Sequence, residues 1–170
     1  MNGVTALLVL GVALSLYPLP AVVGSGYTRS DWKHWIDADQ DCQDTRQEVL
    51  IRDSYTAVVL KDDGCSVVSG VWISPYTNTP ETDPSRLDID HIVPLKWAFE
   101  HGARGWSPTL RQVFANDPEN LVAVRAGENR SKGSRGPDRY LPLVGIGQYL
   151  QKWCSVTGRY NLEMVEECQR

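Results

Sequence analysis

The stretch Asp88-Ile89-Asp90-His91-Ile92-Val93-Pro94-Leu95 places two aspartates and a histidine within a run of mostly apolar, β-branched residues. Such a run predicts a strand over 87–93, and Pro94 suits the first turn of a following helix. Burying a charged side chain without a partner is costly, so polar residues in a buried strand need a partner or a function. This stretch is therefore the first candidate for a functional site.

Two asparagines downstream extend the candidate site. Asn120 precedes a short apolar strand predicted over 121–124, and Asn129 lies on a helix predicted to begin near Ala126. The carboxylates of this strand and the amide oxygen of a later asparagine suit Mg²⁺ or Mn²⁺ better than zinc. His91, with an ordinary pKa of about 6.5, is available to take a proton at neutral pH. The residues thus predict one hard divalent metal beside a general base.

Strand geometry leaves the arrangement of these groups open, because adjacent residues on a regular strand point to opposite faces. Asp90 and His91 share a site only if the strand distorts there. In a regular strand, Asp88 lies on the same face as Asp90 and competes with it as a metal ligand.

Five segments together resemble the HNH (ββα-metal) nuclease superfamily, and most closely its secreted, single-domain proteins of the DUF1524 type. The resemblance spans about residues 27–142. The segments are 34–37 (His-Trp-Ile-Asp), 44–50 (Asp-Thr-Arg-Gln-Glu-Val-Leu), 88–95, 111–121 and 129–133 (Asn-Arg-Ser-Lys-Gly).

The resemblance implies an α+β fold, with a single domain built around an HNH ββα-metal core of a hairpin and a helix at about 86–135, and with flanking helices. It implies an endonuclease that hydrolyses phosphodiester bonds of DNA, RNA or both. In this interpretation His91 activates water, Asp90 and Asn129 bind the metal, and Asn120 braces the hairpin loop as part of the catalytic set. Because no segment is typical of a base-reading helix, we expect little sequence specificity.

The charge distribution indicates where a polyanion would bind. The formal net charge of -4 excludes a basic footprint over the whole chain. Residues 86–139, however, carry nine basic and seven acidic side chains, against five and eleven in residues 27–85. The candidate phosphate contacts are Arg125, Arg130, Lys132 and Arg135. Lys132 follows Asn129 by three residues, which predicts that it shares a helix face with Asn129 and lies over the scissile phosphate.

The beginning of the chain indicates secretion. Residues 4–23 are mostly Ala, Leu and Val, Pro18 and Pro20 interrupt the end of this run, and small residues follow it. This pattern predicts a signal peptide over 1–24 and a secreted nuclease domain over 25–170. A membrane anchor is the alternative, since the run is long enough to span a bilayer. With the signal cleaved, we expect an extracellular monomer without membrane contact.

The four cysteines, Cys42, Cys65, Cys154 and Cys168, form an even set. In a secreted chain this predicts two disulfides. A zinc site is the alternative, but no pair has the Cys-x-x-Cys spacing. The pairs Cys42–Cys65 and Cys154–Cys168 are preferred because each closes a short local loop.

Three other interpretations compete with a nuclease. One is a secreted module on an HNH-like fold that holds nucleic acid or another polyanion without cutting it. Another is a structural or inhibitor protein held together by disulfides. The last is a buried Asp–His ion pair with Asn129 as a helix cap. A nuclease assay with and without EDTA distinguishes a nuclease from all three.

Overall fold

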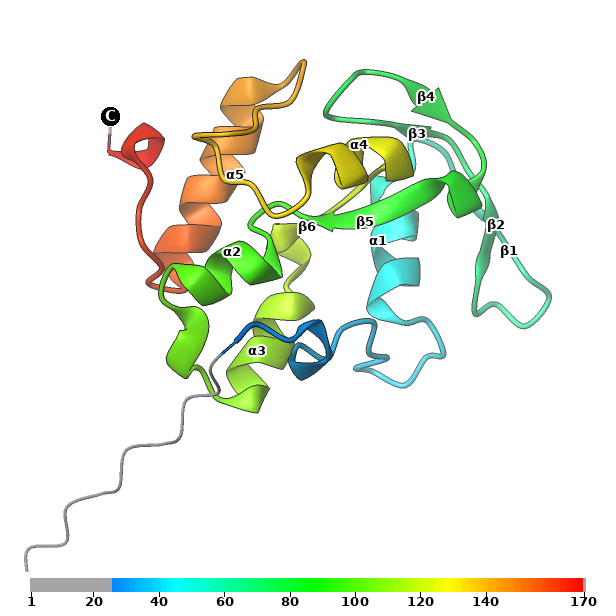
Figure 1. Cartoon of the computed structure of the whole chain (residues 1–170). Coiled ribbons are helices and arrows are strands. Elements are labelled where there is room, and N and C mark those ends of the chain that lie inside the picture. Colours follow the sequence, from blue (N-terminus) through cyan, green and yellow to red (C-terminus); the bar gives the residue numbers. More distant parts are fainter. Residues whose placement is uncertain (1–25, 170) are drawn as a thin grey trace, which may run out of the picture.

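The computed structural model describes residues 26–169, and the expected signal peptide over 1–24 lies outside them. An antiparallel hairpin crosses the middle of the molecule (Figure 1). Its strands are β5 (Leu87–His91) and β6 (Leu121–Arg125), paired without a break in register from Leu87 opposite Arg125 to His91 opposite Leu121. The apolar alternation of the sequence therefore does form a strand, and that strand is regular up to His91.

Helix α4 (Ala126–Lys132) follows β6 directly and lies along β5. Glu128 fixes this helix to the preceding part of the chain, because its carboxylate accepts hydrogen bonds from the hydroxyl groups of Ser74 and Thr77. The hairpin and α4 form a compact unit of two strands and a helix, the arrangement that the family resemblance implies.

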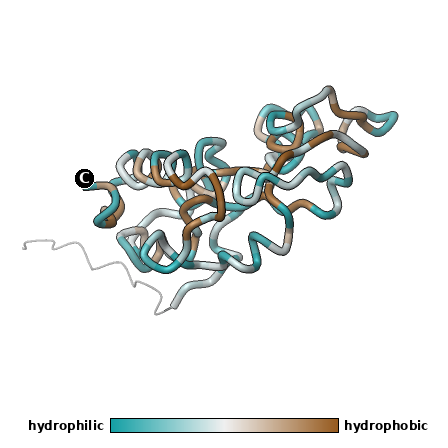
Figure 2. The backbone as a smooth tube through the Cα atoms, turned by 90° about the horizontal axis from the view of Figure 1, so that it is seen from above, coloured by the Kyte–Doolittle hydropathy of each residue, from teal (hydrophilic) through white to brown (hydrophobic). Residues whose placement is uncertain are grey.

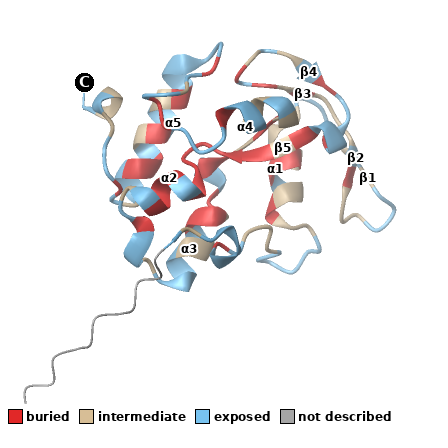
Figure 3. Cartoon of the chain, viewed as in Figure 1, coloured by how far each residue is buried: buried red, intermediate tan, exposed pale blue. Residues whose placement is uncertain are grey.

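Hydrophobic side chains form two clusters, one on each side of the hairpin. One packs helix α1 (Thr45–Asp53) against the β5–β6 face that carries Leu87, Ile89, Leu121 and Ala123. The other joins α2 (Leu95–Glu100), α3 (Pro108–Ala115) and α5 (Ile146–Arg159). Figure 2 colours the backbone by hydropathy, and hydrophobic segments, shown in brown, occur on both sides of the molecule. The hairpin is among the most buried elements (Figure 3).

Helix α1 also holds the hairpin through polar contacts. Asp44 caps the helix by accepting a hydrogen bond from the Gln47 amide at 3.0 Å. Arg46 donates to the carbonyl oxygens of Pro84 and Leu87, next to the start of β5. Arg52 donates in the same way to the carbonyls of Pro118 and Leu121, at the start of β6. Because the two arginines hold both strand starts, neither is a free surface charge.

The remaining elements are short. β1 (Val59–Leu60) pairs with β2 (Val67–Ser69), and β3 (Trp72–Ile73) pairs with β4 (Pro80–Glu81), both antiparallel. Within residues 26–169 the short 3₁₀ turns are η1 (Arg29–Asp31), η2 (Pro84–Arg86), η3 (Ala103–Gly105), η4 (Pro118–Asn120) and η5 (Glu166–Cys168). Helices and small antiparallel sheets make one α+β domain, as expected from the sequence.

Two disulfides connect the expected pairs of cysteines. Cys42–Cys65 joins the loop before α1 to the turn before β2, with 5.2 Å between the Cα atoms. Cys154–Cys168 joins α5 to η5, with a corresponding distance of 5.4 Å. Cross-links over such loops each stabilise a fold by about 3 kcal/mol in the chain-entropy account. Among residues 26–169, no helix has both the length and the apolar character needed to cross a bilayer.

Candidate active site

His91 is the last residue of β5, and its imidazole is held from several sides. Its Nε2 lies 2.9 Å from the carbonyl oxygen of Ala115, at the end of α3. A carbonyl only accepts, so Nε2 carries the proton and Nδ1 is the acceptor nitrogen. The indole of Trp35 stacks on the ring, with 5.9 Å between the centroids. Burial lowers the pKa of His91 to about 3. At neutral pH the imidazole is therefore uncharged and has one basic nitrogen without a hydrogen bond to any residue of 26–169.

Asp90 is buried and accepts two hydrogen bonds. Its Oδ1 lies 2.9 Å from Nζ of Lys132, and its Oδ2 accepts from the Tyr76 hydroxyl at 2.7 Å. Burial raises the pKa of Asp90 and lowers that of Lys132, while the attraction between their charges opposes both shifts. Asp90 is thus a carboxylate matched by one buried ammonium group.

Lys132 does not lie where its sequence position predicts. Its side chain is completely buried, and Nζ donates to Asp90 and to the carbonyl oxygen of His91 at 2.7 Å. The reason is that the shared face of Asn129 and Lys132 on α4 turns toward β5, and not toward solvent. The ammonium group makes its hydrogen bonds inside the protein and is not accessible to a ligand, so the expectation that Lys132 contacts a substrate phosphate is wrong.

The two asparagines have different surroundings. Asn129 donates from Nδ2 to Oδ2 of Asp88 at 3.1 Å. This hydrogen bond does not use the amide oxygen of Asn129. Asn120 is completely buried; its Oδ1 accepts from the Val93 amide at 2.8 Å, and its Nδ2 donates to the Val93 carbonyl at 3.2 Å. Asn120 therefore connects the start of β6 to the chain just after His91, while Asn129 lies beside the acidic residues of β5.

One small cleft of about 70 Å³ is lined by Asp90, His91 and Asn129 together with Arg29 and Gly133. The strand remains regular, so Asp90 contacts α4 while His91 contacts α3. Both still border the cleft because it lies across the end of the strand, so the distortion considered from the sequence is not needed.

The other predicted basic residues are spread over the surface. Arg125 and Arg130 line an open cleft of about 520 Å³ beside the start of α4. Arg125 is 3.8 Å from a carboxylate oxygen of Glu81. Arg135 turns back on its own segment, donating to the carbonyl of Lys132 at 3.0 Å and lying over the Tyr140 ring. Arg125 and Arg130 thus face a common surface, while Arg135 lies on another.

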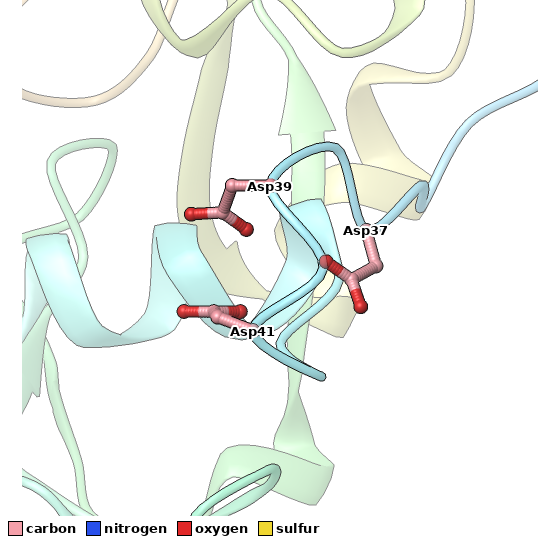
Figure 4. Close-up of side chains that lie close together, drawn as sticks. All are labelled: Asp37, Asp39 and Asp41. Carbon is pink, nitrogen blue, oxygen red and sulfur yellow. The ribbon is translucent and has the colours of Figure 1, made fainter.

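A second group of polar residues lies outside this cleft. Asp37, Asp39 and Asp41 are exposed, and their carboxylates lie within 4.8 Å of one another (Figure 4). Their spacing, with Glu48 at the twelfth position, matches that of calcium-binding loops, and Cys42 has a φ of 74° where such loops have glycine. Exposed acidic groups are common without an ion, so this cluster alone does not identify a metal site.

The comparisons with known proteins agree with the resemblance seen in the sequence. The family model of the C-terminal domain of GmrSD restriction endonucleases matches residues 44–170. The chain belongs to this family. The match to the GmrSD C-terminal domain includes Asp90, His91, Asn120 and Asn129, whereas Arg29 and Trp35 precede it.

An uncharacterized secreted protein of the fungus Arthroderma benhamiae (strain ATCC MYA-4681 / CBS 112371) is 39% identical over 143 residues. The aligned part covers 82% of this chain and 69% of the fungal protein. No solved structure matches. Membership in the GmrSD C-terminal domain family links the chain to endonucleases.

Proposed function

We propose that this protein is a secreted, metal-dependent HNH endonuclease of the DUF1524 type, which hydrolyses phosphodiester bonds of DNA, RNA or both with little sequence specificity. The observation that carries the proposal is the cleft in which a neutral histidine meets the oxygen donors Asp90 and Asn129. These residues lie on a hairpin and helix inside the part of the chain that matches an endonuclease family.

His91 is the general base of the proposed reaction. Nδ1 takes a proton from the attacking water, while the Ala115 carbonyl holds Nε2 in its protonated form and fixes the ring. The buried site penalises an imidazolium ion, so the proton must move on to solvent or to the leaving oxygen after each cycle. Asn120 supports this step indirectly by fixing the chain at Val93.

A divalent metal is the cofactor that HNH nucleases generally use, and the donor set here fits one. Asp90 and Asn129 supply oxygen atoms of the kind Mg²⁺ prefers, with Mn²⁺ as the second candidate. Both oxygens of Asp90 already accept one hydrogen bond, but a carboxylate has about four lone-pair sites, so acceptor capacity remains. When bound, the metal would stabilise negative charge on the phosphate and the leaving oxygen.

The proposed substrate approaches over a surface with positive charge next to the cleft. Arg125 and Arg130 line the larger groove at the start of α4, and guanidinium groups bind phosphates without reading bases. The protein is proposed to act as an extracellular monomer after cleavage of a signal peptide at 1–24. The two disulfides and the name of the fungal relative, a secreted protein, support this location.

A binding module that does not cut nucleic acid is the second candidate, and one observation favours it. Lys132 already neutralises Asp90, which reduces the negative charge available to a metal. A cleavage assay separates the candidates. The protein, incubated with supercoiled plasmid DNA and with RNA, should cut at least one of them in Mg²⁺ or Mn²⁺. EDTA should abolish the cut, and excess Mg²⁺ should restore it. Retarded migration without any cut would support the binding module instead.

A further inference from the structure

Residues 26–43, here called the N-terminal segment, precede the family match but pack against the candidate active site. Trp32 in this segment is buried, and its ring contacts Phe114 of α3 edge-on, with 5.7 Å between the centroids. Trp35 stacks on His91 itself. The segment is therefore part of the wall of the site and not an extension away from it.

Polar contacts fix the segment on both sides of these aromatic residues. Asn116, at the end of α3, donates from Nδ2 to the Lys33 carbonyl at 2.8 Å. The Ile36 carbonyl accepts from both the amide and the hydroxyl of Thr45, at 2.9 Å each. The disulfide at Cys42 closes the end of the segment. These anchors give the backbone around residues 29–36 a defined position beside the hairpin.

Arg29 is the charged residue that this arrangement brings to the cleft. Arg29 lines the same small cavity as Asp90, His91 and Asn129, and it is exposed. Among residues 26–169 it forms no ion pair. Its positive charge is one of the influences that lower the pKa of His91, which agrees with their proximity. Because Lys132 already balances Asp90, the positive charge of Arg29 at the mouth of the cleft has no carboxylate of its own.

We propose that Arg29 binds the scissile phosphate, with its guanidinium donating to the non-bridging oxygens of the diester while His91 activates water. The inference rests on the proposed function and extends it to a residue outside the matched domain. A guanidinium fork suits the two non-bridging oxygens of a phosphodiester, and the exposure of Arg29 leaves it accessible to a substrate.

The test compares Arg29→Ala with Lys33→Ala, which removes the same charge from the same segment at an exposed residue that does not line the cleft. Binding of a labelled DNA duplex is measured in EDTA over a range of salt concentrations. Arg29→Ala should weaken binding about tenfold and reduce the slope of log K against log salt by about 0.9. Lys33→Ala should leave both close to the wild-type values.

Cleavage in Mg²⁺ provides the second readout. Arg29→Ala should lower the single-turnover rate at least about tenfold, and Arg29→Lys should recover only part of it, because an ammonium keeps the charge but not the fork. Equal binding, salt slope and cleavage in the Arg29→Ala and Lys33→Ala proteins would overturn the inference while leaving the nuclease proposal intact. A wild type that never cuts would refute the proposed function, whereas a selective loss of binding in Arg29→Ala would still support the phosphate contact.

Discussion

The ion pair between Lys132 and Asp90 is the most buried electrostatic contact beside the candidate site, with Nζ fully enclosed. Removing one partner of such a pair leaves the other charge without compensation. Lys132→Met should therefore lower the free energy of unfolding by about 3–5 kcal/mol. Replacing both partners, with Asp90→Leu added, should recover much of that loss. Urea titrations of the three proteins measure this, and a loss below about 1 kcal/mol for the single variant would show that the pair is not closed in solution.

The buried neutral form of His91 makes stability depend on pH. In the folded state burial lowers its pKa to about 3, whereas in the unfolded chain it is about 6.5. The unfolded state therefore binds more protons between these values, and unfolding becomes easier as pH falls from 6.5 toward 3. Between pH 7 and pH 5, protonation of this group in the unfolded chain should lower the free energy of unfolding by about 2 kcal/mol.

His91→Gln provides the comparison, since the amide does not titrate. The free energy of unfolding of this variant should fall less between pH 7 and pH 5 than that of the wild type, by the same 2 kcal/mol or so. Urea unfolding at the two pH values decides the matter. Parallel losses in both proteins would mean that the imidazole is protonated or exposed in the folded state.

At the scale of elements, the stability of the hairpin depends on the hydrogen bonds that connect the start of β6 to the chain just after β5. Asn120 makes this connection through two hydrogen bonds to the backbone of Val93, where neither residue meets solvent. Asn120→Ala leaves the Val93 amide and carbonyl without partners. It should lower the free energy of unfolding by about 2–3 kcal/mol. Chemical denaturation measures the change, and a variant as stable as the wild type would show that water replaces the side chain without cost.

The same elements show how far the sequence predicts the site. The β-branched run around Asp90 predicts β5, and the apolar residues after Asn120 predict β6. Both predictions hold because β-branched and apolar side chains suit a pleated strand with a buried face. The spacing also predicts that Asn129 and Lys132 share a helix face. It does not predict that this face turns inward, since that depends on how α4 packs on β5, and packing is a long-range property.

Arg29 and Trp35 were not identified from the sequence as site residues for a related reason. They lie more than fifty positions before His91, and no local pattern connects them to it. Their placement results from Trp32 entering the core and from Asn116 binding the Lys33 backbone. Such contacts are visible only once the whole chain is folded.

On the scale of the whole molecule, the two disulfides fasten peripheral parts of the chain, and Cys154 and Cys168 pack against the larger hydrophobic cluster. Cys154–Cys168 fastens η5 to α5, and neither cysteine lines the cleft of His91. The double variant Cys154→Ser/Cys168→Ser should lose about 3 kcal/mol of stability and still cleave nucleic acid well below its melting temperature. Thermal unfolding and a plasmid assay on the same sample test this, and loss of cleavage in a folded sample would place the C-terminal end in the site.

The single-turnover cleavage rate of His91→Ala in Mg²⁺ measures whether His91 takes the proton from the attacking water. Binding of the DNA duplex in EDTA and the unfolding transition serve as controls that the variant is folded and still holds its substrate. The rate should be at least about 10²-fold below that of the wild type, with duplex binding nearly unchanged. A folded His91→Ala protein that cuts at close to the wild-type rate would show that His91 is not the general base.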